Sequence, residues 1–349
     1  MNSANDKFST QSPASATEVS TAAVKPRLVV IGGSGFIGTR LISLLRAEGT
    51  YDVRNVDIAD SATHPDITTK GDVRRFFDML HAVQDAHIVV LLAAQHRDDV
   101  RPLSRYAETN VEGMRNVLRA MSQHGVRRLI FFSSVAVYGL GKPNVDESAT
   151  PDPANEYGRT KWKAEQLLVQ WQSHHAYRQA IVVRPTVVFG EGNRGNVYNL
   201  LRQIQQGHFL MVGQGTNYKS MAYVGNVVAF VHHLLQHDAT GYQVYNYADK
   251  PDYNTNDLVK LVSETLDKHI PSTHFPLWLG MMGGYCFDIL SQLTRHRFAI
   301  SAARVKKFCA TTQFASDKAM ATGFIPPYPI EQALRQTLRY EFEASAAAE

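Results

Sequence analysis

Apolar and polar positions along the chain form two kinds of pattern that follow one another. Continuous apolar runs occupy residues 28–31, 88–94, 129–132 and 180–183. Between them lie longer stretches in which apolar residues recur at helical spacing, for example from Phe36 to Leu45. Continuous apolar runs are typical of parallel strands buried on both faces, and the longer stretches are typical of amphipathic helices. The alternation predicts an α/β fold with a doubly wound parallel sheet.

The same pattern sets the expected domain boundaries. Residues 1–26 are rich in Ser, Thr and Ala and lack an apolar run, which predicts a disordered tail rather than a signal peptide. Residues 27–185 contain the predicted sheet. Residues 186–342 form a smaller α/β substrate domain, from which strands can return to the first domain. A short tail, 343–349, follows.

Composition narrows the class of protein. The 349 residues carry a formal net charge of +4 without a long block of Lys or Arg, which argues against a nucleic-acid partner. The two cysteines, Cys286 and Cys309, are too few for a disulfide framework and favour a reducing compartment. Histidines form adjacent pairs at 174–175 and 232–233, a spacing that suits a metal poorly. We expect an enzyme that needs no metal.

A glycine-rich loop joins the first predicted strand to the first predicted helix. Gly32, Gly35 and Gly38 are spaced as in loops that make a tight turn and let a pyrophosphate approach the backbone. Phe36 and Ile37 open the helix, whose positive end favours the phosphates. The second predicted strand ends in Asp57, about 20 residues on, where a carboxylate favours NAD over NADP. These features indicate a Rossmann domain that binds NAD, the alternative being a plain strand-to-helix loop.

Further cofactor contacts are expected where later strands end and helices begin. Asp72 and Val73 open a predicted helix, with Asp72 placed to hold the adenine amino group. Ala93 and Ala94 are small residues at the end of a strand, where a cofactor can cross it. Asn110 lies on the next helix. All five residues belong to the predicted cofactor-binding set, together with Tyr157 and Lys161.

The candidate catalytic residues are Ser134, Tyr157 and Lys161. Tyr157 and Lys161 are four residues apart, so they share one helix face. A neighbouring cation favours the phenolate form of tyrosine, which is otherwise too weak a base at neutral pH. Ser134 ends a predicted strand and can share the hydrogen bond to a substrate oxygen. The spacing alone is more typical of an exposed helix face, and the dinucleotide fold in front of it favours catalysis.

These motifs resemble the extended short-chain dehydrogenases/reductases, the family of sugar-nucleotide epimerases and dehydratases. The resemblance spans residues 27 to about 342 and implies a tightly held NAD that is recycled within each turnover. It implies that Tyr157 is the base, that Ser134 orients the sugar hydroxyl and that Lys161 anchors the nicotinamide ribose. Val135 and Ala136 replace the acidic pair of the dehydratases, which favours a 4-epimerase, an isomerase acting through a 4-keto sugar.

Two departures from the family affect the substrate. Val187 stands where nucleotide-sugar epimerases have an asparagine that contacts the diphosphate, and Lys219 stands in place of a phosphate-binding arginine. Both put a UDP-sugar in doubt. With His96 and Asn196 they make up the predicted substrate contacts.

Five runs resemble one group within the family more closely: 94–100, 193–201, 215–226, 283–290 and 304–314. This group comprises the bacterial 4-epimerases that interconvert N-acetylglucosamine and N-acetylgalactosamine on undecaprenyl diphosphate. The resemblance implies that lipid-linked amino sugar as substrate and a role in surface polysaccharide (O-antigen) synthesis. It also implies peripheral binding to the cytoplasmic leaflet of the bacterial inner membrane, and it allows a homodimer.

A segment from about 275 to 307 supports a membrane contact. Residues 275–287 carry no charge and are too few to span a bilayer, and basic residues follow at 295–307. We expect Leu277, Trp278 and Leu279 to face the membrane. The alternative is that 275–290 is ordinary core. Two other functions stay open at this point, a soluble UDP-N-acetylglucosamine 4-epimerase and an NAD-binding regulator without catalysis.

Overall fold

The computed structural model describes residues 24–97, 100–139, 141–207, 209–237, 240–270, 274–294 and 309–343. Seven strands form one sheet in the order β10-β6-β5-β4-β1-β2-β3, and every neighbouring pair is parallel. Their bounds are β1 Arg27–Ile31, β2 Asp52–Asp57, β3 Thr68–Lys70, β4 Ile88–Leu91, β5 Arg128–Phe132, β6 Gln179–Pro185 and β10 Gly241–Tyr247. The predicted doubly wound parallel sheet is thereby confirmed.

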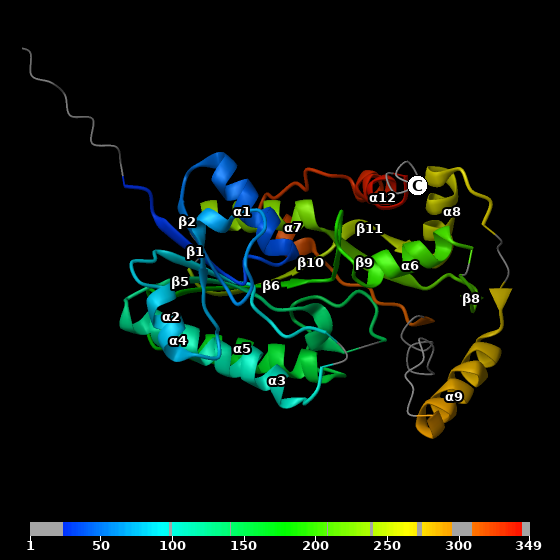
Figure 1. The fold of residues 1–349 in the computed structure, drawn as a ribbon, viewed down its shortest axis with the longest axis horizontal. Helices are drawn as coiled ribbons and strands as arrows, with labels where there is room; N and C mark the ends of the chain where they lie inside the picture. Colours follow the sequence, from blue (N-terminus) through cyan, green and yellow to red (C-terminus); the bar gives the residue numbers. More distant parts are fainter. Residues whose placement is uncertain are drawn as a thin grey trace, which may run out of the picture.

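Helices cover both faces of this sheet (Figure 1). On one face α1 (Phe36–Glu48) packs against α7 (Val224–Gln236). On the other, α4 (Gly113–Gln123) packs between α2 (Phe76–Ala82) and α5 (Glu156–Ser173). Short helical segments lie in the connections: η1 Pro65–Ile67, α3 Ser104–Tyr106, the π-helical η2 Ala107–Glu112 and the 3₁₀ segment η3 Val135–Tyr138.

The second half of the chain adds two small sheets and the remaining helices. β7 (Val187–Phe189), β9 (Tyr218–Tyr223) and β11 (Asp249–Asn254) form a sheet in the order β11-β9-β7, and β8 (Met211–Val212) pairs with β12 (His274–Phe275). The helical elements are α6 Asn196–Gln205, α8 Thr255–Leu266, α9 Leu277–Thr294, α11 Asp317–Met320, α12 Ile330–Leu338 and the π-helical η4 Arg339–Glu343.

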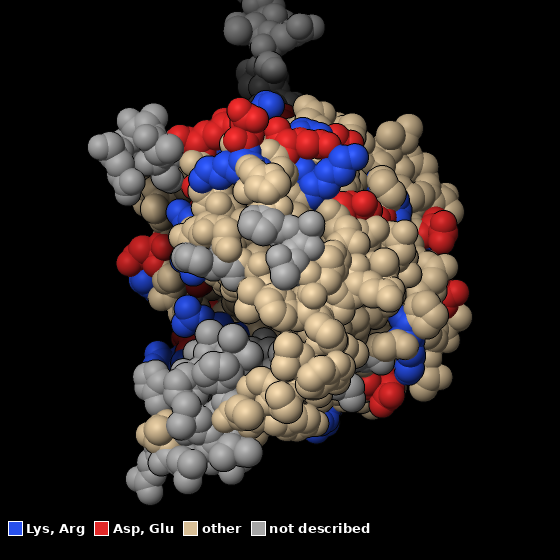
Figure 2. Space-filling model, turned by 90° about the vertical axis from the view of Figure 1, so that its right-hand side faces the viewer, with Lys and Arg blue, Asp and Glu red and all other residues tan. Residues whose placement is uncertain are grey.

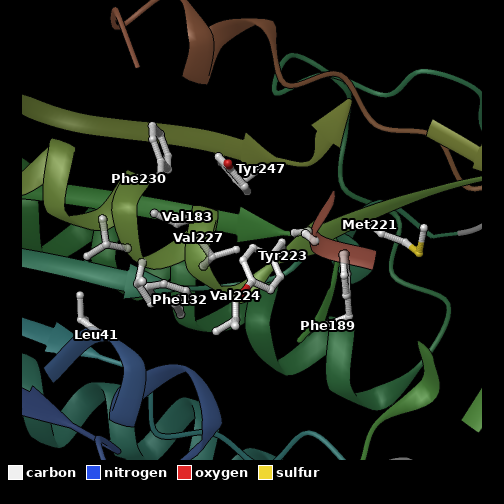
Figure 3. Close-up of a cluster of buried hydrophobic side chains, with 14 of the residues drawn as sticks. Leu41, Phe132, Val183, Phe189, Met221, Tyr223, Val224, Val227, Phe230 and Tyr247 are labelled. Atoms are coloured by element: carbon white, nitrogen blue, oxygen red, sulfur yellow. The ribbon is translucent and has the colours of Figure 1, made fainter. Parts of the chain in front are cut away.

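The hydrophobic core joins the two halves of the chain. One buried cluster runs from Leu28 in β1 through Val227 in α7 to Leu338 in α12. Figure 3 shows part of this cluster, which includes Leu41 of α1, Phe230 of α7 and Tyr247 of the sheet strand β10. Residue 185 therefore divides the sequence but not the core, because β10 and α7 return to the first sheet.

Helix α9 carries several exposed apolar side chains. It projects from the body of the molecule in Figure 1, and Trp278, Met282 and Tyr285 on it are each more than half exposed. Leu277 and Leu279 are exposed as well, so the described part of the segment does not form a closed core. The basic residues expected to follow, 295–307, lie outside the described residues. In the described residues, no helix is both long and apolar enough to cross a membrane.

Candidate active site

A large cleft follows the carboxyl ends of the central strands. Its volume is about 1160 Å³, above the roughly 300–1,000 Å³ typical of small-molecule sites, so a dinucleotide and a second ligand both have room. The predicted site residues that line it are Gly32, Gly35, Phe36, Ile37, Asp57, Asp72, Val73, Ala93, Ala94, His96, Ser134, Tyr157, Lys161, Val187 and Asn196. Residues far apart along the chain thus meet at one edge of the sheet, where open α/β sheets bind ligands.

The glycine loop has the geometry of a phosphate cradle. Gly32 has a φ of +89°, and a Cβ there would lie 2.4 Å from the backbone nitrogen of Ala93. Gly35 is the N-cap of α1 and makes no side-chain cap hydrogen bond, so the first amides of the helix stay available to an anion. At Gly38 a Cβ would lie 2.4 Å from the Cα of Gly33, so the helix start packs directly on the turn. The residues present therefore fit the pyrophosphate of a dinucleotide.

Two carboxylates stand at the far end of the same cleft. Asp57 accepts hydrogen bonds from the amides of Ser34 and Ala59, at 2.9 and 3.0 Å. Asp72 accepts from the guanidinium of Arg74, and that hydrogen bond is the main reason why its pKa lies below the usual value. A carboxyl side chain at the end of β2, the position of Asp57, disfavours a 2′-phosphate and fits NAD rather than NADP.

Lys161 is held by a contact to the central sheet, and Ser134 is held by a contact to η3. The ammonium of Lys161 donates to the carbonyl oxygen of Phe132 at 2.7 Å, and the residue is 2% exposed. Burial lowers the pKa of Lys161 to about 7, against the opposing effect of the Glu165 carboxylate. Ser134 caps η3, and its Oγ accepts from the amide of Ala136 at 3.1 Å. Its hydroxyl hydrogen is left for a ligand oxygen.

Close packing of α5 on η3 brings Tyr157 into the cleft. The helix starts at Asn155, whose side chain accepts from the amide of Gly158 at 2.8 Å. At Gly158 a Cβ would lie 2.3 Å from the carbonyl oxygen of Ala136. Only glycine permits this approach. Gly158 therefore sets the distance between α5 and η3, the segment that Ser134 caps.

A buried ion pair beneath these residues was not anticipated from the sequence. Glu165 pairs with Arg184 at the end of β6 and also accepts from the hydroxyl of Ser133. Arg184 in turn contacts the hydroxyl of Tyr138, which donates to Asn246 at 2.9 Å. Lys161 and Glu165 are four residues apart on α5, and this spacing was the available signal. The network ties α5, β6 and β10 together under the cleft.

Two predicted contacts lie outside the cleft lining. The ammonium of Lys219 donates to the carbonyl of Ala310, while the next residue, Ser220, lines the cleft. Side chains alternate along a strand, so Lys219 and Ser220 of β9 face opposite sides, and the substrate contact predicted for Lys219 stays a prediction. Asn110 is buried behind the cleft.

Asn110 supports the cleft instead of lining it. Its side chain accepts from the amide of Gln95 at 2.8 Å and donates to the carbonyl of Gln95 at 3.0 Å and to Thr160 at 2.9 Å. These hydrogen bonds engage the Asn110 side chain within the protein, and its predicted cofactor contact stays a prediction. The residue fixes the strand end that carries Gln95 and His96 into the cleft.

Comparison with known proteins bears on this geometry. A profile described as the NAD dependent epimerase/dehydratase family matches residues 28–248, more than half of the chain. The chain belongs to that family. NAD is accordingly the cofactor for which the cleft is built.

Individual relatives agree with the family. The chain is 54% identical over 316 residues, 90% of its length and 95% of the relative's, to the N-acetyl-alpha-D-glucosaminyl-diphospho-ditrans,octacis-undecaprenol 4-epimerase of Escherichia coli O157:H7. It is 27% identical to the UDP-glucose 4-epimerase of Vibrio cholerae, over 91% of this chain and 96% of that protein.

Solved structures share the fold. The UDP-glucose 4-epimerase of Thermus thermophilus in complex with NAD has a TM-score of 0.70 at 20% identity, covering 90% of this chain and 98% of that one. The UDP-glucuronic acid 4-epimerase of Bacillus cereus, with UDP-glucuronic acid and NAD, has a TM-score of 0.72 at 19% identity with the same coverage. The extended short-chain dehydrogenase/reductase fold predicted from the motifs is confirmed.

Proposed function

We propose that the protein is an NAD-dependent isomerase that interconverts N-acetylglucosamine and N-acetylgalactosamine on undecaprenyl diphosphate by 4-epimerisation. The observation that carries this is the 54% identity, over 90% of the chain, to the Escherichia coli O157:H7 epimerase whose name states that substrate. The family match supports the same class of reaction.

The cleft residues account for the chemistry as follows. NAD, when bound, supplies an acceptor that takes up a hydrogen and its electron pair from the sugar C4 and later returns them. Tyr157 accepts the proton of the C4 hydroxyl in the first step and gives it back in the second, so the protein ends the cycle unchanged. The Ser134 hydroxyl donates to the same sugar oxygen, and the charged form of Lys161 favours the Tyr157 phenolate.

The residues on the substrate side of the cleft are suited to a sugar diphosphate. They do not depend on a cation that is specific for a nucleotide. Val187 is about one-third exposed in the cleft. Gly195 caps α6 without a side-chain hydrogen bond, and Gly195 and Asn196 both line the cleft, so the amides at that helix start are available to an anion. His96, five residues after the end of β4, lines the same cleft.

We infer further that the protein binds peripherally to the cytoplasmic leaflet of the bacterial inner membrane, through α9. Leu277, Trp278, Met282 and Tyr285 are exposed on this helix, and the described surface around it in Figure 2 shows few charged side chains. A lipid-linked substrate must be reached at a membrane surface, and exposed aromatic and aliphatic side chains suit its headgroup boundary. The homodimer stays a prediction, which sedimentation velocity tests.

The deciding experiment compares two substrates on the unaltered protein. We expect kcat/KM for undecaprenyl-diphosphate-linked N-acetylglucosamine to exceed that for UDP-N-acetylglucosamine by at least about 100-fold, or roughly 2.7 kcal/mol of transition-state binding. Tyr157→Phe serves as the inactive control, since it removes the proton acceptor and leaves the NAD cleft intact. Equal turnover of both sugars points to the soluble UDP-sugar epimerase instead. A Tyr157→Phe variant with substantial activity contradicts the role given to Tyr157.

A further inference from the structure

The loop between β7 and α6, residues 190–195, carries the substrate side of the cleft. Asn193 and Gly195 in this loop line the cleft, as does Asn196 immediately after it. Gly190 and Gly192 have φ values of +150° and +79°, which residues with side chains rarely adopt. Glycines allow the backbone many conformations, so this loop does not hold one conformation by itself. Its position depends on its contacts with the rest of the protein.

One attachment comes from the C-terminal end of the chain. Glu341 in η4 has a side chain that is 1% exposed. One of its carboxylate oxygens accepts from the amide of Gly192 at 2.7 Å, and the other forms a 2.7 Å ion pair with Arg194. The hydrogen bond connects positions 149 residues apart along the chain. Neither Glu341 nor Gly192 is among the residues that line the cleft, so the carboxylate contacts the loop without lining the cleft itself.

Aromatic contacts surround the ion pair between Glu341 and Arg194. The ring of Phe342, next to Glu341, stacks on Tyr198 of α6 with 5.7 Å between centroids. The guanidinium of Arg194 lies 4.4 Å from the centre of the Tyr198 ring. The ion pair is thus fixed on one side by the first turn of α6, the same turn that begins with Asn196.

A second attachment holds the loop to the cofactor side. Arg40 of α1 donates to the carbonyl of Glu191 at 3.0 Å. The Glu191 carboxylate accepts from the hydroxyl of Tyr223 at 3.2 Å. Because α1 starts at the phosphate cradle, these contacts hold the Glu191 end of the loop beside the cofactor side of the cleft even where Glu341 is changed. A defect at Glu341 is expected to affect the substrate alone.

We propose that Glu341 is a positioning residue for the substrate. Acting through Gly192 and Arg194, it holds Asn193, Asn196 and the start of α6 where they meet the sugar diphosphate. This rests on the proposed function only in taking a sugar diphosphate as the ligand of that side of the cleft. A carboxylate is required because it accepts from an amide and pairs with a cation at once, whereas a neutral amide does only the first.

The test is Glu341→Gln, which keeps the size of the side chain and removes its charge. We expect KM for the sugar substrate to rise about tenfold or more, while kcat and the Kd for NAD stay within about twofold. The matched control is Glu343→Gln, the same change two residues along in η4, where the residue is exposed. The control is expected to leave KM, kcat and NAD binding within about twofold.

A second variant replaces Arg194, the exposed partner in the ion pair with Glu341. Arg194 is 63% exposed, so Arg194→Met is expected to fold even where Glu341→Gln does not. It is expected to raise KM in the same direction, and the double variant is expected to be no worse than the more affected single variant, because both remove one interaction.

Two results overturn the proposal. One is an unchanged KM in Glu341→Gln and Arg194→Met. The other is a joint fall in kcat, NAD affinity and melting temperature, which indicates general destabilisation. The assay uses whichever sugar substrate the unaltered protein turns over. Preference for UDP-N-acetylglucosamine therefore counts against the proposed function, while the split between KM and kcat still decides the role of Glu341.

Discussion

Lys161 shows how the fold sets the chemistry of a single residue. Its amine is enclosed between the carbonyl of Phe132 and the ring of Phe131, whose centre lies 4.7 Å away. In this enclosure the pKa falls to about 7, because burial disfavours the charged form. A lysine near its pKa at neutral pH responds to the charge beside it, including that of a cofactor. The same burial carries a stability cost that depends on pH.

Lys161→Met isolates this cost. The unfolded chain keeps the ammonium up to a pKa of about 10.5, while the folded protein loses it near 7. Between these values the unfolded state binds more protons, so the stability contributed at Lys161 rises with pH across that window. We expect the melting temperature of the unaltered protein, relative to Lys161→Met, to increase from about pH 6.5 to about pH 9. A difference independent of pH contradicts the depressed pKa.

At the scale of elements, α9 differs from the other helices of the described chain. Trp278, Met282 and Tyr285 recur at intervals of four and three residues, so they form one stripe along the helix. Each is more than half exposed. Charged side chains gather instead over α8 and α12, where Arg335 pairs with Glu264 and Glu331 (upper part of Figure 2).

Replacing this stripe tests the membrane contact. We expect Trp278→Ser, Met282→Ser and Tyr285→Ser together to lower partitioning onto vesicles that contain anionic phospholipid by about tenfold or more, because apolar burial drives interfacial binding. NAD binding and the melting temperature are expected to stay unchanged. The matched control replaces three exposed apolar residues elsewhere with serine, Phe77, Ile325 and Tyr340. Equal loss in both triple variants, or loss in neither, contradicts a specific role for α9.

At the scale of the whole molecule, the two halves of the sequence share one core. β10 pairs with β6 along its full length, and Phe230 of α7 contacts Tyr247 of β10 and Phe324 near the C-terminal helices. Asp249, buried beyond β10, accepts from the amide of Tyr223 and from Asn226, which also contacts the backbone of Tyr328. Contacts of this kind join the described parts of the two halves in one buried cluster.

A shared core predicts one cooperative unfolding transition. We expect a calorimetric scan of the full chain, with NAD held constant, to give a single peak whose calorimetric and van't Hoff enthalpies agree within about 10–15%. A fragment ending at residue 185 lacks β10 and α7 and is expected to stay unfolded by circular dichroism. Two resolved transitions, or a folded fragment, contradict the shared core.

The sequence by itself determined the features that depend on neighbouring residues. The apolar runs set the central strands, the glycine spacing set the turn before α1, and the four-residue interval placed Tyr157 and Lys161 on one helix face. Each follows from the fixed period of a strand or helix or from the φ that glycine allows. The family of the chain and its cofactor followed from these same local motifs.

Only the tertiary structure decided which side chains meet. It turned Lys219 away from the cleft, placed Asn110 behind it, returned β10 to the first sheet and joined Glu341 to Gly192. A shift of one residue in strand register moves a side chain to the other face of the sheet. Contacts between distant positions depend on strand order and on how loops close, and local periodicity does not encode either. The spacing of the candidate catalytic residues was therefore readable along the chain, whereas the contacts that hold the loop at residues 190–195 required the folded molecule.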